Sequence, residues 1–518
     1  MFKKSASASD AGMAIKVPLR VAVPPLSEPV PRDTPRFSDL MAHGVVHHTI
    51  IQTITQDLKF DHLMPVQAAT LNELLPPSRS DCLVQSKTGS GKTVAFLLPA
   101  IQTLIEKNRG PNAGISLLVI CPTRELAAQI AREADALLQR MPAYKICLAI
   151  GGTNRNAEWN LILAGCDVLV ATPGRLFDYM SKWKALDIFR HLDTLVLDEA
   201  DRLLDMGFLE ALKAIVSHLP DKIETGWQGM LFSATIPPHV QQVARLVLSP
   251  KYKFISTIAP GELNTHEHVP QHLIIVPTFA LLAPTMVGSI WEEAARVGIG
   301  AFKAIVFAHT AAHANFYGHI LSNLPGMPEV YVLHSRFKQS RRTNTTDAYR
   351  SAKSGILVAT DVVARGMDLP GVTTIFQLGI PADQESYIHR LGRTARAGAS
   401  GRGIFIVAKV EEFFPRRILK KITFLPQAAN LSSAPEVKAI AMQMEDLQKA
   451  KIYQAWLGYY KDKVKNLNWT KENLVAEANT FSRDGLGCLE PPPIGKTAVA
   501  KMGLRGTKGL VVVQDGGR

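Results

Sequence analysis

Short apolar runs that alternate with helical stretches recur along most of this chain. The first series reads CLVQ, SLLVICP, KICLAIGG, DVLVATP, TLVLDEAD and GMLFSAT, and each run ends in polar or glycine-containing residues. A second series reads LIIVP, KAIVFA, EVYVLH, GILVATD, VTTIFQL and GIFIVA. Alternation of this kind favours parallel sheets that are covered by helices on both faces. The two series therefore predict two α/β domains with a duplicated core.

The regions outside the two series set the expected domain boundaries. At 518 residues the chain is too long for a single domain. After about residue 425 the strand runs stop and a helical pattern takes over. The expected parts are a flexible leader (1–35), a first domain (36–256), a linker (257–271), a second domain (272–425), a helical C-terminal extension (426–500) and a tail (501–518).

The charge and the cysteines limit the classes of partner and compartment. The formal net charge of +13 serves solubility or indicates a polyanionic partner such as nucleic acid, and charge alone does not separate the two. The five cysteines are scattered and form no C-x-x-C pair, which indicates neither a disulfide framework nor a zinc site. A reducing compartment fits this pattern.

One uncharged stretch, Leu273 to Trp291, is about long enough to span a bilayer. It contains Pro277, Pro284 and Gly288, and its first residues have the pattern of a short buried strand. We therefore predict a strand at this position and no membrane partner.

The stretch QSKTGSGKTV (Gln85 to Val94) follows a strand-like run and precedes a helical one. The strict phosphate-loop pattern G-x-x-x-x-G-K-[ST] requires a glycine at position 86, where this chain has the small Ser86. Backbone N–H groups of such a loop bind phosphates at a helix N-terminus. Lys92 would then neutralise the β- and γ-phosphates, and the Thr93 hydroxyl would bind Mg²⁺.

A second Gly-Lys-Thr triplet occurs at Gly495 to Thr497. It follows PPPI, and the sequence predicts neither a strand before it nor an apolar helix after it. We therefore interpret the second triplet as a chance match.

An acidic pair, Asp198 and Glu199, follows the apolar-biased run Thr194 to Leu197. A phosphate-loop ATPase needs a carboxylate at the end of a buried strand to order its metal ion. Asp198 would hold the water shell of Mg²⁺, and Glu199 would orient and deprotonate the attacking water. Together with the loop, this pair predicts an ATPase that uses Mg²⁺.

The motifs SKTGSGKT, PTRELA, GG, TPGR, DEAD, SAT and HRLGRTAR occur in this order between about residues 37 and 425. In order and spacing they resemble the DEAD-box family of RNA-dependent ATPases. That family's loop begins with a small residue other than glycine, which accounts for Ser86. The resemblance implies ATP and Mg²⁺ as cofactors and RNA as a partner, and we expect a monomer. The expected fold is α/β, with two tandem RecA-like parallel-sheet domains plus the helical C-terminal extension.

The resemblance also assigns the remaining ATP-site residues. Phe60 would stack on the adenine, and the Gln67 amide would read its edge, which favours ATP over GTP. Arg393 and Arg396 would reach the γ-phosphate from the second domain, and Asp368 would contact the ribose. The expected catalytic residues are Lys92, Asp198, Glu199, Arg393 and Arg396. The expected ATP-binding residues are Phe60, Gln67, Ser86, Lys87, Thr88, Gly89, Ser90, Gly91, Lys92, Thr93 and Asp368, of which Thr93 serves Mg²⁺ together with Asp198.

Contacts with RNA are implied in both domains, and they would be made to phosphates and 2′-hydroxyls with little sequence preference. The expected RNA-binding residues are Thr123, Arg124, Gly152, Thr172, Arg175, Thr310, Gln339, Arg342, Thr360 and Arg365. The residues expected to couple ATP to RNA are Asp201, Ser233, Thr235 and His389. An ATP site that is split between two domains is complete only when they close, so RNA that binds both domains would promote hydrolysis.

The C-terminal extension resembles that of the fungal mitochondrial DEAD-box RNA chaperones over AWLGYYKDKVKNLNW and the residues that follow. In that subgroup the extension is thought to support the second domain and to bend or hold structured RNA. The resemblance points to the mitochondrial matrix, with the nucleus or the cytoplasm as alternatives. A generic helical appendage is the other interpretation of this region.

Three functions agree with these motifs. An ATP-dependent RNA helicase or chaperone would unwind and remodel structured RNA. An ATP-dependent RNA clamp or scaffold would hold RNA with little unwinding, through the same site. A DNA translocase of the same superfamily is disfavoured by Gln67 and by the Asp-Glu-Ala-Asp tetrad.

Overall fold

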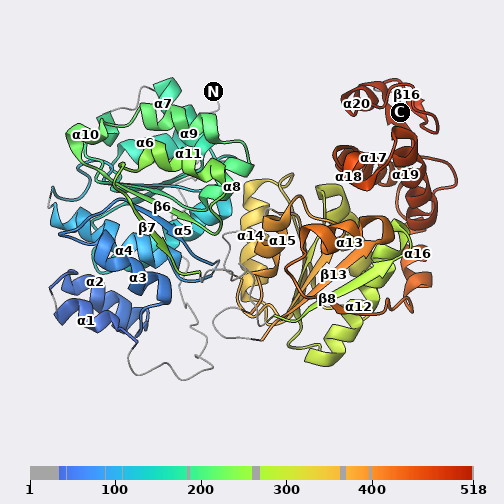
Figure 1. Ribbon diagram of the computed structural model, residues 1–518, viewed down its shortest axis with the longest axis horizontal. Coiled ribbons are helices and arrows are strands. Elements are labelled where there is room, and N and C mark those ends of the chain that lie inside the picture. Colours follow the sequence, from blue (N-terminus) through green and yellow to red (C-terminus); the bar gives the residue numbers. More distant parts are fainter. Residues whose placement is uncertain are drawn as a thin grey trace, which may run out of the picture.

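The computed structural model describes residues 34–42, 44–87, 89–107, 109–183, 187–258, 269–361, 369–395 and 400–515. Two seven-stranded sheets, each with its own helices, lie side by side in these residues (Figure 1). Apart from its last two residues, the expected leader lies outside the described part of the chain. The expected linker overlaps it only at the two ends of the linker.

The first sheet is parallel throughout and has the strand order β3-β4-β2-β5-β6-β1-β7. Its strands are β1 (Cys82–Gln85), β2 (Leu117–Ile120), β3 (Ile146–Ala149), β4 (Val168–Ala171), β5 (Thr194–Leu197), β6 (Gln228–Ser233) and β7 (Lys253–Ser256). The first predicted series of apolar runs coincides with β1 to β6. The edge strand β7 was not predicted, because its residues are largely exposed and form no apolar run.

The second sheet repeats this order strand for strand, as β10-β11-β9-β12-β13-β8-β14. Its strands are β8 (Gln271–Val276), β9 (Lys303–Phe307), β10 (Val330–Leu333), β11 (Gly355–Ala359), β12 (Thr374–Leu378), β13 (Arg402–Ala408) and β14 (Leu425–Pro426). Adjacent strands are again parallel. The prediction of a duplicated α/β core is therefore confirmed.

Helices cover both faces of each sheet because the strands are apolar on both sides. In β5, Leu195 and Val196 belong to hydrophobic clusters on opposite faces of the first sheet. The first domain contains α1 (Phe37–Ala42), α2 (His48–Gln52), η1 (Thr53–Asp57), α3 (Pro65–Leu74), α4 (Lys92–Glu106), α5 (Arg124–Leu138), α6 (Arg155–Leu163), α7 (Pro173–Trp183), η2 (Asp187–Phe189), α8 (Ala200–Asp205), α9 (Leu209–Ser217), α10 (Lys222–Thr225) and α11 (Pro238–Val247). The second contains η3 (Phe279–Leu281), α12 (Leu282–Val297), α13 (Ala311–Ser322), α14 (Gln339–Ser351), α15 (Gln384–Leu391), η4 (Lys409–Glu411) and η5 (Phe414–Ile418).

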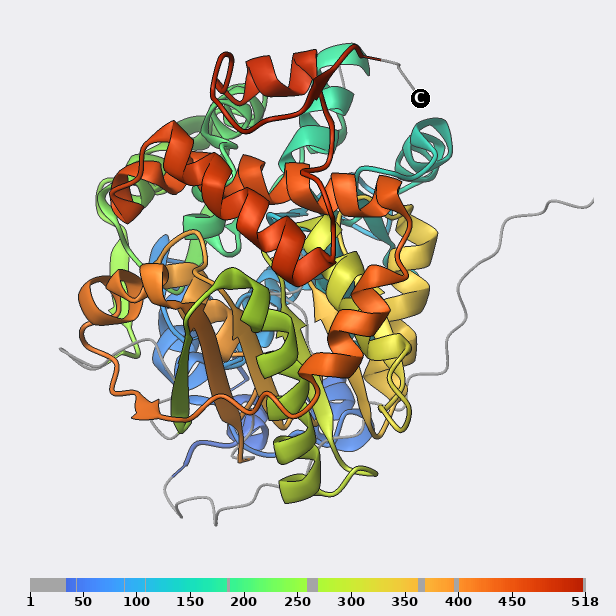
Figure 2. The same cartoon turned by 90° about the vertical axis from the view of Figure 1, so that its right-hand side faces the viewer.

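The C-terminal extension packs on the second domain and shares its hydrophobic core. Its elements are α16 (Ala434–Met442), α17 (Asp446–Tyr460), η6 (Lys461–Lys463), α18 (Val464–Leu467), α19 (Lys471–Leu486), β15 (Ile494–Gly495), α20 (Lys496–Lys501) and β16 (Val512–Val513). The ring of Phe279 in the second domain lies 5.0 Å from those of Trp456 and Tyr460 in α17. Figure 2 shows the extension, in red, lying across the top of the second domain.

The uncharged stretch Leu273 to Trp291 is divided between three elements, β8, η3 and α12. Its first residues belong to β8, as predicted, and its last residues belong to the buried helix α12. None of the helices in the described ranges is long and apolar enough to cross a membrane.

Candidate functional site

The loop between β1 and α4 has the geometry of a phosphate-binding turn. Gly89 and Gly91 have φ angles of 74° and 88°, in the left-handed region that favours glycine. A Cβ atom on Gly91 would also lie 2.7 Å from the Gln67 amide nitrogen. Lys92 begins α4 and is buried, and its Nζ donates a hydrogen bond to the Ser86 carbonyl oxygen over 3.2 Å.

Ser86 closes this loop from the strand side. It is fully buried, and its Oγ lies 3.1 Å from the Oγ of Ser90, which in turn donates a hydrogen bond to the Lys87 carbonyl oxygen. Its backbone N–H donates to the carbonyl oxygen of Ser233 at the end of β6. A small side chain is therefore required at position 86. Thr88, which was predicted to bind ATP, lies outside the described residues.

Gln67 is a buried residue that joins the loop to α3. Its Nε2 donates to the Gly91 carbonyl oxygen over 3.1 Å, and its Oε1 accepts from the backbone N–H of Met64 over 2.8 Å. An amide has two N–H donors and two acceptor lone pairs, so one of each remains to read an adenine edge. Phe60 is partly buried and packs against the core of the first domain.

The acidic pair lies just after the end of β5, which is separated from β1 by the single strand β6 in the sheet. Asp198 and Glu199 are both buried, and Glu199 has a φ angle of 50°, which is strained for a residue other than glycine. Burial raises the pKa of Asp198 to about 7, against the opposing effect of the Lys92 ammonium. The Lys92 charge therefore acts on the Asp198 carboxylate, as a shared nucleotide site requires.

Asp201 connects this acidic segment to the end of β6. One of its carboxylate oxygens accepts hydrogen bonds from the N–H and the hydroxyl of Thr235, over 3.2 and 2.8 Å. Its own backbone N–H donates a hydrogen bond to the Ser233 hydroxyl oxygen. The Ser233 hydroxyl in turn donates a hydrogen bond to the Thr235 carbonyl oxygen. The structure thus brings together three of the four residues that were predicted to couple ATP to RNA.

The fourth, His389, lies in the second domain close to Arg393, one of the two arginines predicted to reach the γ-phosphate. His389 is buried in α15. Arg393 lies two residues after the end of this helix and donates from Nε to the His389 carbonyl oxygen over 3.3 Å. In Figure 1, α14 and α15 lie on the side of the second domain that faces the first. Arg365, Asp368 and Arg396 lie outside the described residues.

Residues predicted to bind RNA meet where α5 of the first domain faces α14 of the second. Arg124 donates to the Gln339 side-chain oxygen over 3.3 Å, and the Gln339 amide donates to Glu125 over 3.3 Å. Arg342 forms an ion pair with Glu125 at 2.5 Å, and both side chains are about 5% exposed. At Gly152, a Cβ atom would meet both Arg124 and Gln339. Glu125 was not predicted, although it stands within PTRELA next to Arg124.

The other predicted RNA-binding residues lie in different local settings. Thr123 caps α5, and Thr310 caps α13 with its side chain partly exposed. Thr360 follows β11. Thr172 precedes α7 and is buried. Arg175 is buried as well.

The buried Arg175 holds the loop that carries Gly152. Its guanidinium donates to Glu158 over 2.7 Å and lies 3.4 Å from the Thr153 hydroxyl and carbonyl oxygens. Thr153 follows Gly152 directly, so Arg175 stabilises the backbone at that glycine. Gly152 itself approaches the second domain, because a Cβ atom on it would lie 3.5 Å from the Gln339 side chain.

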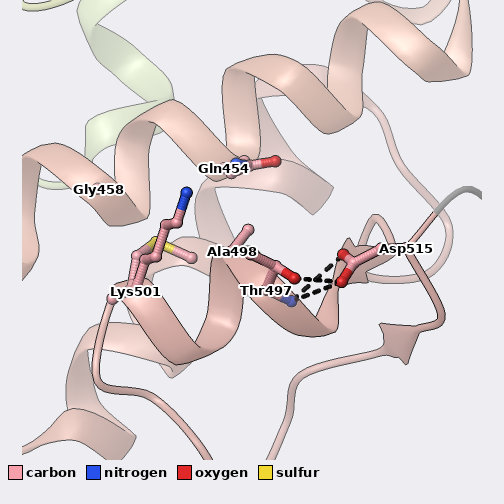
Figure 3. A pocket seen from close by; sticks show the side chains of 7 residues that line it. Gln454, Gly458, Thr497, Ala498, Lys501 and Asp515 are labelled. Atoms are coloured by element: carbon pink, nitrogen blue, oxygen red, sulfur yellow. Dashed lines mark hydrogen bonds between the residues drawn. The ribbon is translucent and has the colours of Figure 1, made fainter.

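The second Gly-Lys-Thr triplet lies in a setting that its sequence did not predict. The two-residue strand β15 ends at its Gly495, and the six-residue helix α20 begins at its Lys496. The N-terminus of α20 already has an anionic partner within the chain, because Asp515 accepts hydrogen bonds from the N–H and the hydroxyl of Thr497 (Figure 3). The triplet therefore serves to fold the extension.

Comparisons with known proteins agree with this geometry. Residues 64–243 match the DEAD/DEAH box helicase family, and residues 300–398 match the helicase conserved C-terminal domain. The chain is 44% identical over 462 residues to the ATP-dependent RNA helicase MSS116, mitochondrial, of Phaeosphaeria nodorum. The aligned region covers 87% of this chain and 82% of that protein. The protein of the same name from Aspergillus oryzae is 40% identical over 465 residues, or 88% of this chain and 72% of that protein.

A solved structure of Mss116p bound to ssRNA and AMP-PNP aligns with a TM-score of 0.83 at 28% identity. The alignment covers 93% of this chain and 98% of that one, so it includes both domains and the C-terminal extension. The relatives share identity far above the level of chance over most of both chains. The chain therefore belongs to the DEAD-box family and is an ATP-dependent RNA helicase with RNA-dependent ATPase activity.

Proposed function

We propose that ATP binds between the two domains and that RNA completes its site. The first domain contributes the loop from Ser86 to Thr93 together with Asp198 and Glu199, and the second contributes Arg393 and Arg396. The observation that carries this proposal is the ion pair between Glu125, which lies next to Arg124 in the first domain, and Arg342, a predicted RNA contact in the second. RNA bound along Arg124, Gly152 and Gln339 would lie on both domains at once and favour the closed arrangement.

The chemistry of the site fits Mg²⁺. The Asp198 carboxylate and the Thr93 hydroxyl are oxygen ligands, and Mg²⁺ binds few protein oxygens in addition to the phosphates. The buried Asp198, with a pKa raised to about 7, would regain its charged form beside a cation. When bound, Mg²⁺ would neutralise charge on the β- and γ-phosphates.

The protein's own residues would then act in three ways. The backbone N–H groups before α4 and the Lys92 ammonium would hold the phosphates in one orientation. The Glu199 carboxylate would orient a water molecule for in-line attack and accept its proton. The guanidinium of Arg393 would stabilise the charge that develops on the γ-phosphoryl oxygens, a contribution of ~10³–10⁵ in rate for arginine fingers.

The cross-domain ion pair gives a prediction about closure. Replacing Glu125 by Arg, or Arg342 by Glu, should lower RNA-stimulated ATP turnover strongly, because loss of one partner of a buried ion pair costs about 3–5 kcal/mol. The Glu125→Arg/Arg342→Glu double variant should regain part of this loss, since the pair re-forms with exchanged charges. Steady-state ATPase assays with saturating RNA measure the effect. Additive losses in the double variant would contradict a direct pair in the active form.

We further propose that the protein unwinds short duplexes and remodels structured RNA rather than only clamping it. All the residues predicted for hydrolysis are present, so the bound state can be reset in each cycle. Strand displacement from a labelled RNA duplex, with and without ATP, tests this. ATP-dependent displacement supports unwinding. Tight ATP-dependent RNA binding without displacement supports the clamp.

We also propose that the protein acts in mitochondria, in the matrix. The two fungal relatives described above carry the word mitochondrial in their names. Imaging of a fluorescent fusion to the full chain, compared with a fusion that lacks residues 1–35, tests the location and the role of the leader. Uniform cytoplasmic or nuclear signal from the full-chain fusion would contradict it.

A further inference from the structure

Three side chains at the end of α17 and in η6 fix one short segment of the second domain. The Tyr459 hydroxyl donates a hydrogen bond to the Ile380 carbonyl oxygen over 2.6 Å, and Lys463 donates from Nζ to the Pro381 carbonyl oxygen over 3.3 Å. Tyr460 acts through a carboxylate: its hydroxyl donates to Glu411 over 2.7 Å, and the same Glu411 oxygen accepts the Ile380 N–H over 3.2 Å. Both backbone groups of Ile380 are therefore held, directly or through one residue, by the extension.

The segment held in this way leads directly into α15. Two residues after Pro381, the Asp383 carboxylate caps this helix by accepting the Ser386 N–H over 2.6 Å. Helix α15 is eight residues long, and Arg393 follows it and is bound to the His389 carbonyl oxygen. A displacement at Pro381 would therefore move a rigid helix and the arginine at its far end.

The two hydrogen bonds through Glu411 are buried, and those of Tyr459 and Lys463 are part-buried. Ile380, Glu411 and Tyr460 are each at most 1% exposed. Burial raises the pKa of Glu411, while its hydrogen bonds from Tyr460, Ala408 and Ile380 oppose that rise. A hydrogen bond in such a low-dielectric environment is stronger than one in water, and a lost partner is correspondingly costly.

The same two tyrosines contact the segment that ends at a predicted RNA-binding residue. The ring of Tyr459 lies 4.5 Å from that of His309, and the Tyr460 hydroxyl lies 3.4 Å from His309 Nε2. His309 directly precedes Thr310, the partly exposed cap of α13. Tyr459 and Tyr460 therefore contact both the residue before Thr310 and the segment that leads into α15.

We propose that Tyr459, Tyr460 and Lys463 are positioning residues for ATP hydrolysis. They hold residues 380–383 so that α15 presents Arg393 to the γ-phosphate of ATP when the domains close. This inference rests on the role proposed above for Arg393. It assigns to the extension an effect on the chemical step, in addition to its packing on the second domain.

The hydrogen bonds from Tyr459, Tyr460 and Lys463 to this segment form a clamp, in a sense unrelated to the RNA clamp above. This clamp can be separated from the packing of the extension. Packing is carried by apolar side chains such as Trp456, Val475 and Phe481, which belong to the hydrophobic core shared with the second domain. The Tyr459 hydroxyl and the Lys463 ammonium contribute hydrogen bonds to carbonyl oxygens at the entrance to α15. Replacing these two polar groups therefore changes the clamp and retains the apolar contacts.

The test compares Tyr459→Phe and Tyr459→Phe/Lys463→Met with the native chain in RNA-stimulated ATPase assays. Tyr453→Phe is the matched control, because it removes a hydroxyl from the same helix that bonds to Asn479 within the extension. We expect kcat to fall about tenfold in the double variant, less than the ~10²-fold that a misplacement of 1 Å can cost. The KM for RNA should stay within about twofold, and the melting temperature should fall no more than in the control.

A second comparison identifies Arg393 as the residue through which the clamp acts. In an Arg393→Ala background, measured by single-turnover hydrolysis of labelled ATP, the clamp substitutions should have no further effect.

Native turnover in Arg393→Ala would overturn the role of Arg393 and the clamp with it. If Arg393→Ala is inactive but both clamp variants keep the native kcat, only the clamp is overturned. Equal fold-losses in the two backgrounds would also overturn it, because they would indicate a structural effect alone. The isosteric Tyr459→Phe variant provides the same comparison if the double variant does not fold.

Discussion

Replacing Glu199 by Gln is expected to leave a protein that binds ATP and RNA but hydrolyses ATP ~10²–10⁴-fold more slowly, the usual contribution of a general base. Glutamine keeps the size of the side chain and can still hold a water molecule, but it cannot accept the proton. Glu199 is buried in a left-handed backbone conformation at the end of β5, so its carboxylate is fixed relative to the loop. ATP turnover with saturating RNA measures the loss of hydrolysis, and binding of a fluorescent ATP analogue measures the retained ATP binding.

Glu210→Gln is the matched control for this variant. Glu210 lies in the same domain, its side chain is 81% exposed, and it pairs only with Lys213 of the same helix among the contacts the structure gives. The control should have native turnover. Retention of more than about a tenth of native turnover in Glu199→Gln would assign the base to another residue.

Replacing Lys92 by Ala is expected to lower kcat/KM for ATP by on the order of 10²–10³-fold, since loss of a buried charged partner costs 2–5 kcal/mol or more. Two effects add here. The phosphates lose a buried cation, and the pKa of Asp198, already about 7, rises further without the Lys92 ammonium. A raised pKa means that more Asp198 is protonated at neutral pH, which weakens its hold on Mg²⁺.

The pH dependence separates the two effects. If Asp198 is more protonated in Lys92→Ala, residual turnover should increase with pH above 7 more steeply than in the native protein. Lys107→Ala, at the exposed C-terminal end of α4, is the control and should behave like the native protein. Native kcat/KM in Lys92→Ala would show that the loop at Gly89 to Lys92 does not bind the phosphates.

The sequence could predict the buried strands and the motif residues, because both depend on the pattern of neighbouring residues. Buried strands form continuous apolar runs, so β1 to β6 and β8 to β13 were identified. The edge strands β7 and β14 were not, because exposed residues carry no such pattern. The family motifs also assigned a coupling role to Asp201, Ser233 and Thr235, which follow the adjacent strands β5 and β6, but the hydrogen bonds between them were not predicted.

Contacts between distant residues could not be predicted in the same way. The Arg124–Gln339 bond joins residues 215 positions apart, and the Tyr459–Ile380 bond joins residues 79 apart. Periodicity and motifs describe single segments and carry no information on which segments meet. The second Gly-Lys-Thr shows the same limit, because α20 depends on Asp515, which lies outside its own segment. Its few residues form a helix only in that tertiary setting.

The measurement that tests the account most directly is ATP turnover by the native chain as single-stranded RNA is added, with single-stranded DNA of the same sequence as the comparison. An ATP site that RNA completes predicts slow turnover alone, an increase of at least about tenfold that saturates with RNA, and a much smaller increase with DNA. Turnover that does not depend on RNA, or no turnover with RNA present, would contradict the account.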